Sequence, residues 1–379
     1  MHVLTIPSWY PLDDNDMNGS FFRDYFAMHS DFHTFSGLIA PQLIAYRSKQ
    51  ITKTRYLAGI HYNDTPGPSI RFAFPNLPQS IKPLYHRTVG LFIFRKYLEI
   101  YGRPDIIHVH SMIWGGYLAL EIKKRYGIPY ILTEHNSRYV GNGKLSSKEK
   151  QASKMVIMNA DHVVAVSEFM RDELIKMFDY QKYITVIPNL VKIHRSTHPS
   201  SERAGIISVC HLNKNKRIDL LLKSYAMSKS KLTHQLTIVG AGSEKSHLED
   251  LARQLGIAKD VNFLGELSNE AVAQHLSKSA LFVSCSRFET FGVALVEALT
   301  NGVPVITTPS GGPSGFVKSY NGIYLNSDDP SDISDAIDKV LENHDTYDNL
   351  LIASNAMKNF SPDAIGKIYS SLFMDVVNS

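Results

Sequence analysis

Cysteine is nearly absent from this sequence, and so are long apolar runs and a strong net charge. Only two of the 379 residues are cysteine, Cys210 and Cys285, which excludes a disulfide framework and a thiolate zinc cage. Because both lie in apolar runs, we expect small buried side chains in a reducing compartment. A net charge of +4 is too small to indicate nucleic-acid binding, although it allows a local basic patch that meets phosphates or an anionic membrane surface.

Signals for membrane insertion or secretion are missing as well. No window approaches about 20 uninterrupted apolar residues, the length that a membrane span needs. The first residues carry no basic leader, and Pro7, Trp9 and Pro11 interrupt their apolar stretch, so we expect no signal peptide. We therefore expect a cytoplasmic protein.

The composition that is present is that of a globular protein, with 44% hydrophobic and 20% charged residues. It excludes disorder, collagen and coiled coil. At about 150 residues per domain, the length predicts two or three domains. Short β-rich runs, such as 35–40 and 129–133, alternate with longer helical patterns along most of the chain. This order is typical of parallel sheets that are buried on both faces by helical crossovers.

One polar stretch divides the alternating pattern into two series. Residues 192–204 contain Pro199 and several serines and have no apolar period, so they read as a linker. We predict one domain over 1–190 and a second over 191–359. An apolar stripe of Ile365, Ile368, Tyr369, Leu372, Phe373 and Val376 predicts a last helix. Doubly wound domains of this kind bind ligands in the crevice at the carboxyl ends of their strands.

The most informative stretch is SRFETFGVALVEALTNGVP, residues 286–304. It follows an apolar strand, and it places Glu289 in a turn and Glu297 inside a helix. Phe291 and Gly292 open that helix, where unpaired N–H groups and the helix dipole favour an anion. Carboxylates at these positions would suit sugar and ribose hydroxyls, and the helix start would suit phosphate. Spacing alone slightly favours the alternative that Glu289 is solvated and Glu297 pairs with a charge elsewhere.

Two further turns follow strands of the second series. HLNKNKR, from His211 to Arg217, collects cations that would neutralise a diphosphate, unless it is simply a solvated basic loop. Gly240 opens a Gly-Ala-Gly turn that lacks the third glycine of the dinucleotide fingerprint, so it is a weak NAD signal.

The first series has its own candidates. Gly19 precedes a helix near the end of the first strand, and His135 follows another strand. A lone histidine is more often a structural hydrogen-bonding residue. His108 and His110 alternate along one strand, but no third ligand lies nearby in sequence, so we expect no metal site.

With these residues in place, the sequence resembles the retaining glycosyltransferases of family four, which have the GT-B fold. The similar segments occur in the family's order: IPSWYP and NGSFFR between Pro7 and Arg23, IIHVHS, YILTEHNS, VSEFMRDEL, VIPNLV and the Glu-seven-Glu signature SRFETFGVALVEA. The resemblance implies two facing Rossmann-like domains. The first would bind the acceptor and the second the nucleotide-sugar donor, with a terminal helix at 360–379 crossing back to the first.

The resemblance also implies roles for individual residues. Glu289 would meet the donor sugar, beside the backbone amides of Phe291 and Gly292, and Lys216 would neutralise the diphosphate. The remaining implied contacts are Glu297 with ribose, the backbone at Leu264 and Gly265 with the base, Gly19 with phosphate, and His135 with the donor sugar and the acceptor. Helix dipole and cations would stabilise the leaving diphosphate, so no divalent metal and no resident cofactor is implied.

Two positions depart from the family's pattern. His211 stands where an arginine is common, so either Lys214 or Arg217 replaces that charge or the diphosphate is held with less charge. Thr290 stands where a glycine is usual, which adds bulk beside the donor sugar.

We therefore expect retaining transfer of a sugar from a UDP- or GDP-linked donor. The acceptor would be a saccharide or a polyprenyl-linked saccharide of a surface polysaccharide, such as lipopolysaccharide. A nucleotide-sugar epimerase or hydrolase of the same fold, or a non-catalytic nucleotide-sugar binding protein, is the alternative; an oxidoreductase would need a complete glycine fingerprint. Basic and aromatic residues interleave at 82–96, which would suit peripheral contact with the inner face of the cell membrane or a half-buried helix.

Overall fold

The computed structural model describes residues 1–11, 19–33, 35–44, 59–63, 66–75, 81–141, 143–192, 194 and 203–379. The chain divides into two compact units, one of Met1–Val166, Met170–Leu190 and Pro362–Ser379, the other of Ser167–Phe169 and Val191–Ser361. Within the described part of the chain, no helix is both long and apolar enough to cross a bilayer.

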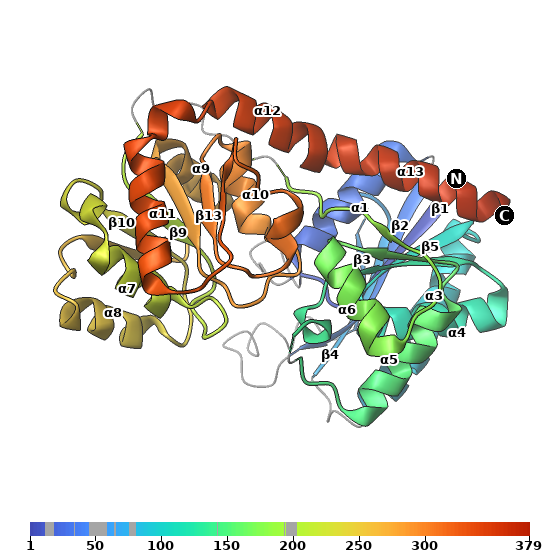
Figure 1. The fold of residues 1–379 in the computed structure, drawn as a ribbon. Coiled ribbons are helices and arrows are strands. Elements are labelled where there is room, and N and C mark those ends of the chain that lie inside the picture. Colours follow the sequence, from blue (N-terminus) through green and yellow to red (C-terminus); the bar gives the residue numbers. More distant parts are fainter. Residues whose placement is uncertain are drawn as a thin grey trace. The chain divides into compact units, whose positions relative to one another are not determined.

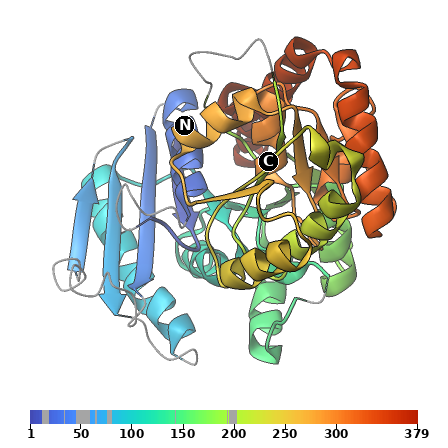
Figure 2. The same cartoon turned by 90° about the vertical axis from the view of Figure 1, so that its left-hand side faces the viewer.

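The first unit is built on an eight-stranded sheet with the order β3-β4-β2-β1-β5-β6-β7-β8. Its strands are β1 (His2–Pro7), β2 (Phe35–Ile44), β3 (Gly59–Asn63), β4 (Ser69–Pro75), β5 (Ile106–His110), β6 (Tyr130–Glu134), β7 (His162–Ala165) and β8 (Ile184–Val186). Its helices are α1 (Ser20–Phe32), α3 (Lys82–Tyr101), α4 (Tyr117–Tyr126), α5 (Ser147–Asn159), α6 (Glu168–Phe178) and α13 (Pro362–Asn378). In Figure 2 the blue strands of this sheet stand side by side at one edge.

The second unit has a six-stranded sheet, β11-β10-β9-β12-β13-β14, in which every pair is parallel. Its strands are β9 (Ile206–Val209), β10 (Leu236–Val239), β11 (Val261–Gly265), β12 (Leu281–Ser284), β13 (Val305–Thr307) and β14 (Gly322–Tyr324). Its helices are α7 (Ile218–Met227), α8 (Lys245–Gln254), α9 (Asn269–Lys278), α10 (Val293–Thr300), α11 (Pro330–Glu342) and α12 (Asn349–Phe360).

The terminal helix α13 belongs to the first unit, as expected from the sequence. Its buried residues Ile365, Tyr369 and Phe373 pack with Tyr25 of α1 in one core cluster, and Figure 1 shows α13 lying along α1. The predicted stripe was wrong at Ile368, whose side chain is 45% exposed. Two parallel-sheet α/β domains with this returning helix confirm the predicted fold class.

Three elements were not predicted. The strands β3 and β4 form an antiparallel pair at the edge of the first sheet, where an all-parallel sheet was expected. β3 is an edge strand with only one neighbour, so its pattern is weaker than that of the buried central strands. β4 lies between β3 and β2, and the partly buried Arg71 interrupts its apolar run. Helix α12 was also missed; its Leu350 and Leu351 are exposed, which blurs its apolar stripe.

Candidate functional site

The carboxyl ends of the strands of the second sheet carry most of the predicted site residues. Because all six strands are parallel, their following loops meet at one edge of the sheet. His211, Lys216 and Arg217 follow β9, Gly240 follows β10, Leu264 and Gly265 end β11, and the turn from Glu289 to Gly292 follows β12. The second unit therefore collects on one edge residues that are as far as 81 positions apart, from His211 to Gly292.

An ion pair lies at the centre of this edge. Lys216 Nζ donates to Glu289 Oε1 at 2.5 Å, and the two side chains are only 24% and 16% exposed. Both side chains act on the thiol of Cys210, but burial is the larger effect and raises its pKa to about 12. The edge therefore presents a fixed cation beside a fixed carboxylate, with little bulk water around them.

The other cations of this loop have different surroundings. Arg217 Nη1 donates to Asp328 Oδ2 at 2.5 Å, and Arg217 itself adopts the left-handed conformation with φ of 50° at the start of α7. His211 and Lys214 are exposed. The guanidinium of Arg217 thus already has a carboxylate partner.

Helix α10 begins at this edge in a form that suits an anion. Gly292 is its N-cap with φ of 104°, and no side chain accepts a hydrogen bond there. The first-turn N–H groups of an uncapped helix favour a bound anion. Phe291, just before it, is 3% exposed and packs against Phe316 and Phe360 with centroid distances of 5.3 and 5.7 Å, which fixes the helix start.

Two glycines bring strand ends close together. A Cβ on Gly240 would lie 1.9 Å from the carbonyl oxygen of Cys210, so only glycine fits between β9 and β10 at this point. The Gly240 N–H donates to the Gly265 carbonyl at 2.7 Å. Leu264, beside it, is 39% exposed and offers an apolar surface at the same edge.

Glu297 lies farther along α10 and lines a small pocket of the second unit. The pocket is also lined by His194, Asn269 of α9 and Asn301, together with Lys192 and several apolar side chains. The cavity has room for about one water molecule, so it shows only that Glu297 has polar neighbours. Thr290 is partly buried between Glu289 and Phe291.

In the first unit, Gly19 is the N-cap of α1 with φ of 82°. A Cβ there would lie 2.7 Å from Trp9 Cδ1, so the indole requires a glycine. Among the residues that the structure describes, no side chain caps the start of α1, so its first turn resembles that of α10.

His135 lies in a buried hydrogen-bond network of the first unit. Its Nδ1 is 2.8 Å from Asn189 Oδ1, and its Nε2 is 3.0 Å from His110 Nδ1. Since an amide oxygen only accepts, Nδ1 carries the proton and Nε2 accepts from His110. Burial lowers the pKa of His135 to about 3, so the ring is neutral. Either nitrogen would have to exchange a protein partner before it could bind a substrate hydroxyl.

Glu134, next to His135, was not singled out from the sequence. Its Oε1 accepts the backbone N–H of His135 and Asn136 at 2.9 and 2.7 Å, and its Oε2 accepts that of Met112 at 2.8 Å. Burial raises the pKa of this carboxyl to about 7 and outweighs the hydrogen bonds, which lower it. A glutamate at the end of a fully buried strand is the sequence signal that could have identified it.

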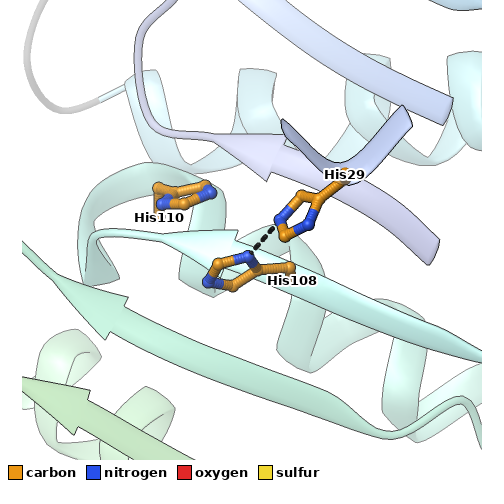
Figure 3. Close-up of side chains that lie close together, drawn as sticks. All are labelled: His29, His108 and His110. Atoms are coloured by element: carbon orange, nitrogen blue, oxygen red, sulfur yellow. Dashed lines mark hydrogen bonds between the residues drawn. The ribbon is translucent and has the colours of Figure 1, made fainter. Parts of the chain in front are cut away.

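The tertiary structure adds a third histidine to His108 and His110. With His29 of α1, candidate ligand atoms of the three residues all lie within 4.8 Å of one another. Figure 3 shows the three side chains together. Two of the rings already share a hydrogen bond, His29 Nε2 to His108 Nδ1 at 2.7 Å, and all three are fully buried. No carboxylate belongs to the group to balance a dication. We interpret it as a packed network of neutral imidazoles.

The sequence patterns of two families match this chain. "Glycosyltransferase Family 4" matches residues 54–195, and "Glycosyl transferases group 1" matches residues 191–356. The chain belongs to these glycosyltransferases, and the family predicted from the sequence is confirmed. It is 25% identical over 320 residues to a glycosyltransferase of Methanocaldococcus jannaschii, covering 76% of this chain and 81% of that protein.

Solved structures share the fold over nearly the whole chain. The lipopolysaccharide outer core galactosyltransferase WaaB is 19% identical with a TM-score of 0.70 and 99% of both chains covered. The Anabaena protein HepE in complex with UDP-glucose is 16% identical with a TM-score of 0.73, over 99% of this chain and 100% of that one. The protein is thus a glycosyltransferase of the GT-B type.

Proposed function

We propose that this glycosyltransferase moves a sugar, with retention of configuration, from a nucleotide-sugar donor to a hydroxyl of a saccharide or lipid-linked saccharide. The pair of Lys216 and Glu289 is the observation that carries the proposal. It places a cation for a diphosphate directly beside a carboxylate that accepts hydrogen bonds from sugar hydroxyls.

The donor would bind at the carboxyl edge of the second sheet. Its diphosphate would face Lys216 and the uncapped N-terminus of α10, its ribose Glu297, and its base the backbone at Leu264 and Gly265. A UDP- or GDP-linked sugar fits these groups. UDP-glucose in HepE supports a uridine donor.

The chemical step we propose needs no enzymic nucleophile. As the bond between the anomeric carbon and the diphosphate oxygen breaks, the acceptor oxygen forms its bond to the same carbon on the same face, and the departing diphosphate takes the hydroxyl proton. Lys216 and the α10 dipole would stabilise the charge that develops on the diphosphate. We propose that this electrostatic assistance suffices without a divalent metal.

The acceptor would be part of a surface polysaccharide, in line with the lipopolysaccharide enzyme WaaB, which shares the fold. The first unit would bind it. The roles of Gly19 and His135 toward phosphate, donor sugar and acceptor stay predictions.

We also propose peripheral contact with the inner face of the membrane through α3. Leu84, Phe92 and Ile100 of this helix are exposed by 57%, 43% and 52%. Arg95 is exposed beside Phe92. Leu84, Phe92 and Arg95 lie on one side of the helix, within about 80° of one another at 3.6 residues per turn. Glu99 is exposed on the same side and pairs with Lys96 at 2.6 Å, so basic side chains outnumber unpaired carboxylates there, which suits an anionic bilayer surface.

Phe92→Glu and Arg95→Glu should each reduce co-sedimentation with liposomes containing phosphatidylglycerol. Arg87→Glu is less informative, because Arg87 already pairs with Glu121 at 3.1 Å. Unchanged co-sedimentation of both variants would remove the membrane proposal.

The function is tested in two steps. A thermal-shift screen with UDP-, GDP-, ADP- and CDP-sugars should find one donor that raises the melting temperature. Release of the nucleoside diphosphate from that donor should then depend on added saccharide acceptor. Turnover without an acceptor would favour an epimerase or hydrolase, and binding without turnover a non-catalytic protein. A product of inverted configuration would contradict retention, and loss of turnover in EDTA would contradict metal independence.

A further inference from the structure

One residue, Asn215, joins the loop after β9 to the loop after β12. The Arg287 N–H donates to the Asn215 carbonyl at 2.8 Å. The side-chain amide of Asn215 makes two more bonds: Nδ2 donates to the Phe288 carbonyl at 3.0 Å, and Oδ1 accepts the Phe288 N–H at 3.3 Å. A single side chain thus serves both the N–H and the carbonyl of Phe288.

These bonds lie one residue before each member of the central ion pair. Asn215 precedes Lys216, and Phe288 precedes Glu289. The backbone connection therefore fixes where both side chains begin, although the two residues are 73 positions apart.

The ladder that joins β9 directly to β12 ends well before the two loops, although β10 supports the first loop as far as Leu212, whose N–H donates to the Ala241 carbonyl at 2.8 Å. The ladder between β9 and β12 pairs Leu281 with Ile206 and Phe282 with Ile207. From Ile207 the chain runs nine more residues to Lys216. A lysine side chain has four rotatable bonds, so the placement of its backbone decides where its ammonium can reach.

Each loop is also stiffened on its own side. Asn213 Oδ1 accepts the N–H of Asn215 at 3.0 Å and that of Lys216 at 3.3 Å, which closes a turn. On the other side, the Glu289 N–H donates to the Ser310 carbonyl at 2.8 Å. Asn215 connects these two supported loops through its hydrogen bonds to Arg287 and Phe288.

We propose that Asn215 is a positioning residue that sets Lys216 against Glu289 for the donor diphosphate. The inference rests on the proposed donor role of this pair. Asparagine suits the position because its short side chain carries both a donor and an acceptor, which the carbonyl and the N–H of Phe288 require. A displacement of about 1 Å at a reacting group can cost about 100-fold in rate, so Asn215 matters although it touches no substrate.

The test uses three single variants of the full chain and the affinity for UDP, or for the diphosphate of whichever donor the screen identifies. Asn215→Ala removes both side-chain bonds and adds no charge. Asn215→Asp keeps the oxygen that accepts the Phe288 N–H, but it replaces the NH2 group that donates to the Phe288 carbonyl with a second oxygen, which cannot donate. Asn213→Asp is the matched control, because it puts the same charge into the same loop and keeps both acceptor bonds.

We expect Asn215→Ala to weaken diphosphate binding and to lower kcat about tenfold or more, each with the melting temperature close to that of the parent. Asn215→Asp should lose more diphosphate affinity and more kcat than Asn213→Asp. If both aspartate variants lose equal affinity and kcat, the added charge is responsible and not the loss of the bonds to Phe288, and the proposal is overturned. Normal binding and kcat in Asn215→Ala would also overturn it.

A double-mutant cycle separates positioning from general stability. If Asn215 acts through Lys216, then Asn215→Ala should change diphosphate affinity little in a Lys216→Ala background. Full additivity would overturn the inference. If the parent protein binds none of the nucleoside diphosphates, the proposed function fails first; if it binds one and the Asn215 variants bind equally well, only this inference fails.

Discussion

Lys216 Nζ and Glu289 Oε1 are 2.5 Å apart, although 73 residues separate them in the sequence. Opposite charges in a partly buried place attract more strongly than on an open surface. We therefore expect Lys216→Ala and Glu289→Ala each to reduce transfer by about 100-fold or more while the fold persists. Acceptor-dependent release of nucleoside diphosphate measures this, with circular dichroism as the check on folding. Lys259→Ala, at an exposed position before β11, is the control and should lose far less. Near-normal turnover in Lys216→Ala would show that its assigned role is wrong.

Glu297→Ala should act mainly on donor binding. A carboxylate that accepts ribose hydroxyls contributes about 1.5–3 kcal/mol, so its loss should weaken donor affinity roughly 10- to 100-fold. Isothermal calorimetry with the donor found in the screen gives the value. Glu249→Ala changes a partly exposed carboxylate on α8 that faces Lys245, and this variant should bind the donor as the parent does. If the Glu297 variant binds the donor normally but turns over slowly, Glu297 acts in the chemical step and not in donor binding.

Arg217 tests the cost of a left-handed backbone against that of an ion pair. With φ of 50°, a side chain at this position is strained, and glycine is not. Its partner Asp328 is 59% exposed, so the pair contributes little to stability. Both Arg217→Gly and Arg217→Ala lose the pair, and we expect the glycine variant to be more stable by about 1 kcal/mol in urea unfolding. An alanine variant of equal or greater stability would contradict this account.

The buried histidines should make the protein sensitive to acid. Burial lowers the pKa of His108 and His110 well below 6.5, so both stay neutral in the fold, whereas the unfolded chain binds protons below about pH 6.5. Stability is thus unaffected above that pH and falls as the pH drops below it. Each such histidine adds about 1.4 kcal/mol per pH unit to the slope.

Glu134 acts in the opposite direction between pH 4.5, the ordinary pKa of a glutamate carboxyl, and about pH 7, because burial raises its pKa to that value. The contribution of one histidine is therefore read from a difference. His108→Gln should flatten the loss of unfolding free energy between about pH 6.5 and 5 relative to the parent, and His247→Gln, exposed on α8, should not. Identical slopes in the parent and His108→Gln would rule out His108 as a source of the acid sensitivity.

Glu134→Gln should destabilise the first unit. The carboxylate accepts three backbone N–H groups, and an amide replaces one acceptor oxygen by a donor that faces one of them. A buried donor left without a partner costs about 1–3 kcal/mol. Urea unfolding at pH 8 measures the loss, with Glu121→Gln on α4 as a control that breaks surface ion pairs. A loss no larger than that of the control would mean that the three N–H groups have other partners.

Much of the fold was legible because local patterns and tertiary structure agree. The central strands of both sheets read as apolar runs, since they are covered on both faces. The edge strand β3 and the partly exposed helix α12 were not predicted, because elements with less burial carry weaker apolar patterns. The inner strand β4 was missed because Arg71 interrupts its apolar run. The family signature around Glu289 and Glu297 was legible for another reason: its spacing is set by one strand, one turn and one helix, all consecutive.

The sequence by itself determined the class of this protein, because the motifs that define the class lie in short segments that can be recognised, in their order, from the sequence alone. It also supplied the residue types of the donor edge. Only the tertiary structure decided which side chains meet. Lys216 pairs with Glu289, Arg217 pairs with Asp328 and is therefore not a free cation, and His29 bonds His108. These pairs join segments that are far apart in the sequence, and which segments become neighbours depends on the strand order and on the reach of the side chains, neither of which is encoded in local spacing.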